Sequence, residues 1–389
     1  MKYEFKRQKL IQLANIQTGP FGSQLHKEDY VDNGTPIVTV EHLGKRRFAE
    51  QNLPKVSDED KKRLNKYILR KGDIVFSRVG SVDRCSYVDT FYDGWMFSGR
   101  CLRVRPFSDV LPLYLYYFFC LQDTKEFIRN IAVGATMPSI NTKLMGEIEV
   151  IYPSIEIQQK VIKILSVLDD KIELNNKINW NLADLLQTVY QEQFGNVSSA
   201  TTQGNLSDLC SYSRDRVPVS MLDANTYFST ENMLPGKAGA TKATSLPTTP
   251  QTTACHKGDT MLSNIRPYFK KIVYCEEDCG CSTDVLCFTP AQPQYAAYLF
   301  STLYADKFFA FMVAGSKGTK MPRGDKQQIM SYPVVLPSDK DLDEFNAIAL
   351  PILEQIHSNR GENKRLSAVR DVLLPKLMSG ELDFSKINI

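Results

Sequence analysis

Short loops that combine glycine with arginine, lysine or asparagine occur in both halves of this chain, and their side chains are suited to hydrogen bonding with a polar ligand. Arg78 lies in a Ser-Arg-Val-Gly-Ser segment at 77–81, and Asn264 and Arg266 lie in a Ser-Asn-Ile-Arg-Pro-Tyr segment at 263–268. An arginine can bond two acceptors of guanine, and an asparagine can bond two groups of adenine. We therefore predict that these three side chains read base edges of double-stranded DNA.

Lysines in the same loops suit phosphate contacts, where a point charge suffices. The net charge is only +3, so DNA binding would depend on where the charges lie rather than on their sum. The predicted DNA-contact set consists of Lys45, Arg46, Arg47, Arg78, Arg84, Thr136, Asn141, Arg214, Arg216, Asn264, Arg266, Tyr268, Lys270, Lys271, Lys320, Arg323 and Lys326.

The motifs of DNA-modifying enzymes are missing from the sequence. It contains no Gly-x-x-x-x-Gly-Lys-Ser/Thr phosphate loop, no Gly-x-Gly-x-x-Gly and no Asn/Asp-Pro-Pro-Tyr/Phe tetrapeptide. The four histidines are scattered, which gives a histidine-centred metal or triad site little support. We therefore predict no catalytic residue and no cofactor in this chain.

The nine cysteines are an odd number in a long chain without a secretory signal, which favours free thiols and a cytoplasmic location. Cys275, Cys279, Cys281 and Cys287 are close in sequence, but they lack the paired Cys-x-x-Cys spacing of common zinc sites, so we expect no metal. The apolar stretch 111–121 is shorter than the roughly 20 residues of a membrane span and predicts a buried helix.

The chain contains one internal repeat. Gly-Ala-Thr-Met-Pro at 134–138 is answered by Gly-Thr-Lys-Met-Pro at 318–322, 184 residues later. The strand-like runs that end at Pro153 and Pro337 keep this displacement, and Lys-Gly-Asp recurs at 71–73 and 257–259. Because order and spacing both persist, we expect two domains of one fold rather than two unrelated domains.

A long amphipathic helix is predicted after each of these prolines. Apolar residues recur at heptad positions in both segments, and an asparagine occupies the same position of each. An asparagine on an apolar seam fixes register and partner, which favours pairing of the two helices over packing of each on its own domain. The predicted seam consists of Val161, Ile164, Leu168, Asn175, Leu182, Leu185, Val189, Ile348, Ile352, Asn359, Leu366, Val369 and Leu373.

Glycines and prolines mark the limits of these elements. Gly195 is expected to end the first helix, and Pro351 is expected to kink or break the second near Leu350. The Ser/Thr-rich segment 196–204 predicts a linker, and 237–253 predicts a long loop. The resulting bounds are 1–153 for the first domain, 154–195 for the first helix, 196–337 for the second domain and 338–389 for the second helix with a C-terminal tail.

Four segments match the specificity subunits of type I restriction-modification systems. They are Thr-Gly-Pro-Phe-Gly-Ser-Gln-Leu at 18–25, the loop 134–141, residues 318–326, and Arg-Asp-Val-Leu-Leu-Pro-Lys-Leu-Met-Ser-Gly-Glu at 370–381. The chain resembles this family over essentially its full length. The resemblance implies an α+β fold in which two pseudo-repeated target-recognition domains, each a mixed β-sheet with helices, are joined by two long helices in an antiparallel coiled coil.

The same resemblance implies partners and a division of labour. Each domain would read one part of a bipartite DNA target. Two methyltransferase subunits would methylate adenine with S-adenosylmethionine, and two restriction subunits would cut unmethylated DNA with ATP and Mg²⁺. This chain would be the non-catalytic subunit that determines which DNA sequence the complex acts on.

Two other functions compete with this one. The first is a DNA modification or restriction enzyme whose catalytic motif has diverged, which would bind S-adenosylmethionine or cut DNA alone. The second is a protein-binding scaffold, since paired helices and aromatic-rich domains also suit that role. A gel shift with and without a methyltransferase partner separates the three.

Overall fold

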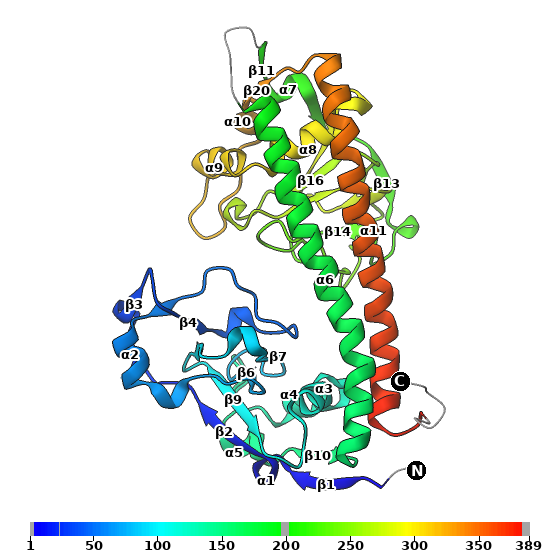
Figure 1. Cartoon of the computed structure of the whole chain (residues 1–389). Coiled ribbons are helices and arrows are strands. Elements are labelled where there is room, and N and C mark those ends of the chain that lie inside the picture. Colours follow the sequence, from blue (N-terminus) through cyan, green and yellow to red (C-terminus); the bar gives the residue numbers. More distant parts are fainter. Residues whose placement is uncertain (1–3, 23, 196–201, 383–389) are drawn as a thin grey trace. The chain divides into compact units, whose positions relative to one another are not determined.

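The computed structural model describes residues 4–22, 24–195 and 202–382. The chain divides into two compact units: unit 1 comprises Met1–Glu173 and Asn363–Ile389, and unit 2 comprises Leu174–Glu362. Both long helices, α6 (Ile155–Phe194) and α11 (Asp339–Met378), are cut by this division, so that each unit holds part of both (Figure 1). The bounds expected from the sequence instead treat the helices as separate segments.

Unit 1 contains two four-stranded sheets and one strand pair. One sheet has the order β2-β9-β6-β7 and is antiparallel, the other has the order β3-β5-β4-β8, and β1 pairs with β10. The strands are β1 (Lys6–Lys9), β2 (Ala14–Thr18), β3 (Tyr30–Val31), β4 (Thr35–Val38), β5 (Lys55–Val56), β6 (Ile74–Ser77), β7 (Cys85–Tyr87), β8 (Met96–Phe97), β9 (Cys101–Pro106) and β10 (Glu149–Tyr152). The shorter helices are α1 (Leu10–Leu13), α2 (Asp58–Arg63), α3 (Pro112–Cys120), α4 (Gln122–Ile131) and α5 (Thr142–Gly146).

Unit 2 repeats this topology except in its second sheet, where β18 is the inner strand and β14 the edge strand, whereas in unit 1 β4 is the inner strand and β8 the edge strand. Its sheets have the orders β12-β19-β16-β17 and β13-β15-β18-β14, and β11 pairs with β20. The strands are β11 (Gln203–Asn205), β12 (Cys210–Tyr212), β13 (Arg216–Pro218), β14 (Tyr227–Phe228), β15 (Gln251–Cys255), β16 (Thr260–Ser263), β17 (Ile272–Tyr274), β18 (Cys279–Cys281), β19 (Val285–Pro290) and β20 (Pro333–Val335). The shorter helices are α7 (Leu206–Leu209), α8 (Ala296–Tyr304), α9 (Asp306–Ala314) and α10 (Lys326–Met330). The internal repeat of the sequence is thus a repeat of the fold.

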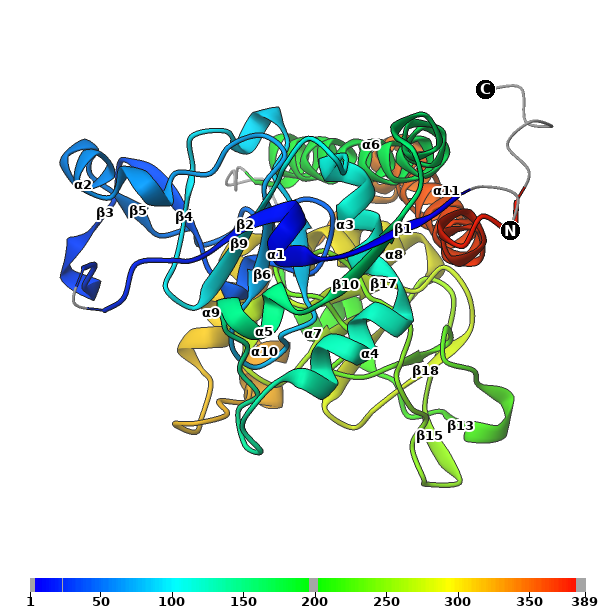
Figure 2. The same cartoon turned by 90° about the horizontal axis from the view of Figure 1, so that it is seen from below.

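The core of unit 1 centres on α3, which lies between the sheet β2-β9-β6-β7 and the long helices (Figures 1 and 2). Pro112 occupies the first turn of α3, where its fixed φ suits a helix start. Residues Tyr114 to Phe119 of this helix are buried, and they join one cluster with Phe76 of β6, Val161 of α6 and Leu377 of α11. Burying each such large side chain contributes roughly 1.5–3 kcal/mol. The buried helix predicted over 111–121 is therefore confirmed.

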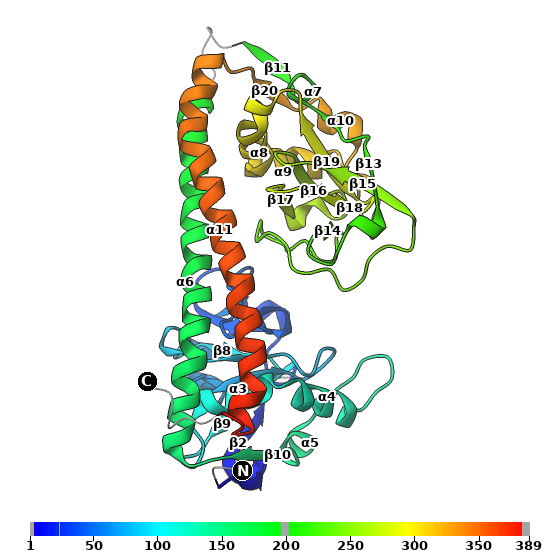
Figure 3. The ribbon, with the colours of Figure 1, turned by 90° about the vertical axis from the view of Figure 1, so that its right-hand side faces the viewer.

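Unit 2 has the same layers. Its helix α8 lies between the sheet β12-β19-β16-β17 and the long helices (Figure 3). Every residue of α8 is buried, and the cluster includes Phe288 of β19, Leu186 of α6 and Phe345 of α11. Each domain therefore uses the long helices as part of its own core.

The long helices are uninterrupted. α11 runs without a break from Asp339 to Met378, so the expectation that Pro351 divides it near Leu350 is wrong. Pro351 and Pro375 both lie on exposed positions, where water can bond to the carbonyl that a proline leaves without its usual partner. Gly195 follows the last residue of α6, as the sequence predicts.

Polar pairs set the register of α6 and α11, which run antiparallel. In unit 2, Asn175 donates to Glu362 at 2.7 Å and Asn359 donates to Asn179 at 2.8 Å, so positions rise in one helix as they fall in the other. Asn175 and Asn359 are both buried. Each thus bonds across the helix pair, as a register-fixing asparagine should, although the two do not bond to each other.

Burial follows the predicted seam only in part. Val161 and Ile352 are buried, but Leu185, Ile348 and Val369 are 49%, 44% and 48% exposed. The buried positions beside them are Leu186 and Ala349. The helices pack on the domains as well as on each other, so the buried face is wider than a strict heptad stripe and drifts from it. The remaining apolar seam positions are half-buried: Ile164, Leu168, Leu182, Val189, Leu366 and Leu373.

The predicted linker is shorter than expected. Residues 196–201 of it lie outside the described residues, but Gln203–Asn205 forms β11 and pairs with β20. The segment 237–253 is a long loop up to β15, as predicted. Among the helices of the described residues, none combines the length and apolarity that crossing a membrane requires.

Candidate nucleic-acid interface

The loop after β6 in unit 1 is fastened to a second loop, residues 133–141. The Ser77 hydroxyl donates to the Val79 carbonyl at 2.7 Å and shapes the turn at the strand end. The Gly80 N–H donates to the Pro138 carbonyl at 2.8 Å, and the Arg78 carbonyl accepts from the Ile140 N–H at 2.9 Å. These bonds join the two loops into one surface, which we call the unit 1 loop pair (residues 77–81 and 133–141).

Unit 2 builds the corresponding surface with the same bonds. The Ser263 hydroxyl donates to the Ile265 carbonyl at 3.2 Å, and the Arg266 N–H donates to the Pro322 carbonyl at 2.8 Å. The Asn264 carbonyl accepts from the Gly324 N–H at 3.3 Å. We call residues 263–271 and 317–326 the unit 2 loop pair. Arg266 takes the place of Gly80, so the repeat extends to single hydrogen bonds.

The helix behind each loop pair is capped by a residue at the end of the loop. The Asn141 side chain accepts from the Leu144 N–H at 2.9 Å, and Asp325, 184 residues later, accepts from the Gln327 and Gln328 N–H groups at 3.0 and 3.2 Å. Because this oxygen is used as an N-cap, Asn141 holds the loop in place rather than presenting its carbonyl oxygen to a base.

Arg78 is well placed for recognition. It is half-buried, its guanidinium lies 5.6 Å from the centre of the Phe21 ring, and one of its terminal nitrogens donates to the Gly99 carbonyl at 3.2 Å. Gly19 brings the Phe21 segment close, because a Cβ at this position would lie 2.1 Å from the Ser98 carbonyl oxygen. Stacking and one backbone bond fix the direction of Arg78, whose Nε atom is buried, so that the other terminal nitrogen is the one left for a ligand.

The two predicted readers of unit 2 differ from each other. Asn264 is 8% exposed, and its Oδ1 atom is buried without a hydrogen-bond partner within the described part of the chain. Its side chain is therefore covered by the loop pair rather than presented to a base. Arg266 is half-buried: its Nε atom is buried, and a terminal nitrogen of its guanidinium donates to the Lys320 carbonyl at 3.3 Å at an exposed position.

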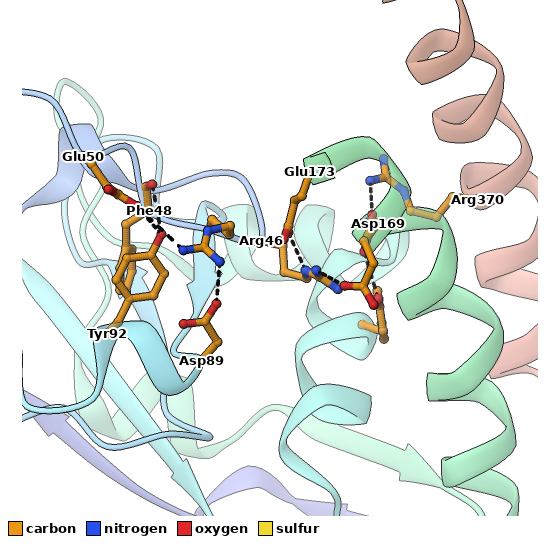
Figure 4. A network of polar contacts seen from close by, with 11 residues as sticks. Arg46, Phe48, Glu50, Asp89, Tyr92, Asp169, Glu173 and Arg370 are labelled. Atoms are coloured by element: carbon orange, nitrogen blue, oxygen red, sulfur yellow. Dashed lines mark hydrogen bonds and ion pairs between the residues drawn. The ribbon is translucent and has the colours of Figure 1, made fainter. Parts of the chain in front are cut away.

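The predicted cluster of Lys45, Arg46 and Arg47 is mostly structural. Arg46 forms ion pairs with Glu173 at 2.6 Å and with Asp170, and its side chain is 13% exposed (Figure 4). Burial alone would lower the pKa of Arg46, but its bonds to Glu173 and Asp170 raise that pKa above the ordinary value. Arg46 therefore connects its loop to α6, and only Lys45 of the three is exposed.

Other predicted contacts are also occupied by partners inside the chain. Arg47 pairs with Asp89 at 2.8 Å, and Arg84 donates to the Leu43 carbonyl. Lys270 pairs with Asp306 at 2.9 Å, and Lys271 donates to the Thr230 carbonyl at 2.5 Å. Burial lowers the pKa of Lys271, with Glu231 acting in the opposite direction. These side chains stabilise loops, which short-range sequence patterns could not reveal.

The remaining predicted contacts lie on the surface. Lys320 and Lys326 are exposed, and Arg323 is exposed beside Asp284, which it meets at 3.0 Å. The exposed or half-buried members of the predicted set that could face a ligand are Lys45, Arg78, Thr136, Arg214, Arg216, Arg266, Tyr268, Lys320, Arg323 and Lys326.

Exposed apolar residues in and beside the loop pairs were not among the predicted contacts. Phe21 lies beside Arg78, and Met137 and Met321 occupy equivalent positions of the two loop pairs, each more than half exposed. The repeated Met-Pro dipeptide was visible in the sequence as a marker of the repeat. Its signal as a surface feature was a methionine between glycine and proline, where a core residue is not expected.

The cysteines of unit 2 form a small core. Cys255, Cys275, Cys279, Cys281 and Cys287 are buried free thiols in one apolar cluster, and the Cys275 and Cys279 sulfurs are 3.9 Å apart. Within the described residues no group of His, Cys, Asp or Glu side chains is arranged to hold a metal ion. Burial in an apolar core is the ordinary setting of unreactive thiols.

A family model described as the type I restriction modification DNA specificity domain matches residues 3–183. The chain is 32% identical over 133 residues to the type I restriction enzyme HindI specificity subunit of Haemophilus influenzae, in a match that spans 33% of this chain and 29% of that protein. It is 23% identical over 307 residues to the MjaIX specificity subunit of Methanocaldococcus jannaschii, covering 72% of this chain and 71% of that one.

A crystal structure of the type I restriction-modification S subunit from M. genitalium has a similar fold, with a TM-score of 0.55 and 16% identity over 97% of this chain and 96% of that one. That likeness confirms the fold of two sheet-rich domains with two long helices. The matched specificity domain, the relatives in two organisms and this fold therefore make the chain similar to the specificity subunits of type I restriction-modification systems.

Proposed function

We propose that this chain is the sequence-reading subunit of a type I restriction-modification complex, and that each loop pair contacts one part of a bipartite DNA target. The observation that carries the proposal is the repeated construction of the two loop pairs, in which equivalent bonds join the loops that carry Arg78 in unit 1 and Arg266 in unit 2. Two equivalent surfaces on one chain suit a target with two parts. Because the proposed ligand is genomic DNA, we place the protein in the cytoplasm.

We further propose that the exposed apolar residues of the long helices dock methyltransferase subunits. In unit 2, Leu174, Ile178 and Leu185 of α6 are exposed and recur at intervals of four and seven, so they share one helix face. In unit 1, Val167 of α6 and Val369 and Val372 of α11 are also exposed. Such aligned apolar side chains mark interaction surfaces. The complex would contain two methyltransferase and two restriction subunits, which hold S-adenosylmethionine, ATP and Mg²⁺.

A gel shift with the full chain tests the proposal. Duplexes containing two randomised segments separated by a fixed gap are offered to the chain with and without its methyltransferase partner. We expect enrichment of two defined segments, and no methyl transfer from labelled S-adenosylmethionine by the chain alone. Methyl transfer or cleavage by the isolated chain would support the enzyme alternative, and absence of selective DNA binding in both arms would support the scaffold.

A matched pair of variants tests whether the units read separately. Arg78→Ala should relax selection in one half-site and Arg266→Ala in the other, each by roughly 1–3 kcal/mol if the arginine pairs with guanine. Lys320→Ala is the control, because losing an exposed phosphate contact should weaken binding to all sequences alike. Relaxation of both half-sites by either arginine variant would contradict independent reading.

A further inference from the structure

Residues with a strained, positive φ angle lie close to one turn of unit 2. The described residues include four non-glycine residues with positive φ, and three of them are Lys237 at 64°, Arg266 at 50° and Lys270 at 51°. Arg266 and Lys270 flank a single 3₁₀ turn, Pro267–Phe269. A residue with a side chain adopts this left-handed backbone conformation at an energetic cost. It keeps that conformation only where surrounding contacts stabilise it.

Two neighbouring segments hold the turn in place. The Gly236 and Lys237 N–H groups donate to the Phe269 and Lys270 carbonyls at 2.7 and 2.9 Å. Asp306 accepts from the ammonium groups of Lys237 and Lys270 at 2.8 and 2.9 Å. On the other side, the Arg266 N–H bonds to the loop 317–326 as described above. The turn is therefore fixed from both sides although its own backbone is unfavourable.

The rigid turn displays an aromatic ring. Tyr268 is 49% exposed at its tip, and its ring centre lies 4.8 Å from that of the partly exposed Phe269. In unit 1 the place of Arg266 belongs to Gly80, and the residue two positions later, Val82, is buried. The strained, exposed aromatic turn is thus specific to unit 2, so the shared fold does not require it.

The surroundings of Tyr268 favour an anionic partner. The unit 2 loop pair contains Arg266, Lys270, Lys271, Lys317, Lys320, Arg323 and Lys326, against one acid, Asp325. Lys320 and Lys326 are exposed, whereas Asp306 and Asp284 offset Lys270 and Arg323. A rigid ring in a basic setting matches double-stranded DNA better than an apolar protein surface, because phosphates supply the opposite charge and bases supply flat faces.

We propose that the turn 266–270 inserts the Tyr268 ring into the base stack of the half-site read by unit 2. This inference rests on the proposed function and adds a mode of recognition to it. A side chain wedged between base pairs unstacks one step, and sequences that unstack readily are then selected without a hydrogen bond to a base. The enforced backbone keeps the ring pointed outward, so that little freedom is lost on binding.

The test uses the full chain and the duplexes that it enriches from the randomised pool. 2-Aminopurine is placed at each step of both half-sites in turn, since its fluorescence rises when it is unstacked. We expect a severalfold rise at one step of the unit 2 half-site. Tyr268→Ala should abolish the rise and weaken binding by about 5- to 150-fold, whereas Tyr268→Phe should keep both.

Phe127→Ala is the matched control, because Phe127 is an exposed aromatic of α4 outside either loop pair. It should change neither readout. Selective binding without an unstacked step, or an unstacked step that persists in Tyr268→Ala, would contradict insertion of the Tyr268 ring. Neither result would contradict the proposed function. If Tyr268→Ala bound DNA normally but lost its methyltransferase partner, the turn would be a protein contact. If no duplex were enriched, the proposed function would fail and the wedge with it.

Discussion

At the scale of single residues, burial separates basic side chains that hold the fold from those that can face DNA. Arg46 and Lys45 are neighbours, yet Arg46 is nearly buried against Glu173 while Lys45 is exposed (Figure 4). Arg46→Ala would leave Glu173 without its partner, so we expect a loss of about 2–3 kcal/mol in the free energy of unfolding, measured by urea denaturation. Lys45→Ala should stay within about 0.5 kcal/mol of wild type. Equal stability of the two variants would show that the ion pairs of Arg46 make no net contribution to the free energy of unfolding.

A second residue-scale prediction concerns Glu276. Burial raises the pKa of this carboxyl to about 7, with Arg360 and Lys257 acting in the opposite direction. Because the pKa is higher in the folded chain than in the unfolded chain, the contribution of Glu276 to stability is full below about pH 4.5 and is lost as the pH rises through 7. Glu276→Gln removes this titration, so we expect the variant to lose less thermal stability than wild type between pH 5 and pH 8.

Glu277→Gln is the control for that comparison, because Glu277 is the exposed neighbour of Glu276. It should follow the wild-type pH dependence of the midpoint of thermal unfolding. Parallel curves for wild type and Glu276→Gln would mean that Glu276 does not titrate in this window.

The sequence could predict which loops carry charge, but not which charges are free. The segments around Arg78 and Arg266 were recognisable from glycine, proline and basic residues, and both arginines lie on the predicted loops. The partners of Arg46 and Lys270 are 127 and 36 positions away, at Glu173 and Asp306. Only the folded chain brings such residues together, so a local pattern assigns these side chains to DNA by default.

At the scale of elements, the repeat and the long helices were predictable because both rest on periodic patterns. The position of the buried helix face was less so. Leu185 and Ile348 fit the heptad but are exposed, since packing on α8 and on the sheets selects Leu186 and Ala349 instead. The prediction that Pro351 breaks α11 was wrong. The energetic cost of a proline inside a helix depends on whether water reaches the carbonyl that loses its hydrogen bond, and the sequence does not show this.

The strained turn gives an element-scale prediction. Both Arg266→Gly and Arg266→Ala remove the guanidinium, but only glycine accepts a φ of 50° without a side-chain clash. We expect Arg266→Gly to be more stable than Arg266→Ala by about 1 kcal/mol, seen as about 2–4 °C in thermal unfolding. Arg214, an exposed loop residue without positive φ, is the control, and there glycine should be no more stable than alanine. The same ordering at both positions would argue against strain at Arg266.

At the scale of the whole molecule, one chain carries two copies of a fold and two helices that each belong to both units. The two long helices are the elements that both units share, so their length bears on the distance between two DNA readers. α6 and α11 each contain 40 residues without interruption. The length of this pair should therefore set the spacer between the two half-sites of the proposed target.

The register of the helix pair shows where to test this. The bonds Asn175–Glu362 and Asn179–Asn359 put the residues after Glu173 opposite those before Arg365, so a heptad inserted after Glu173 is matched by one inserted after Lys364. This matched insertion keeps both polar pairs and lengthens each helix by about 10 Å at ~1.5 Å per residue, or about 3 base pairs at ~3.4 Å each. We expect the preferred spacer, selected from a library with fixed half-sites and a variable gap, to lengthen by about 3 base pairs. Affinity should fall somewhat, because the added base pairs also rotate one half-site around the duplex axis.

A single insertion in one helix is the control and should disrupt pairing of the two helices. An unchanged preferred spacer in a folded, DNA-binding double insertion would show that the length of the helix pair does not set the spacer.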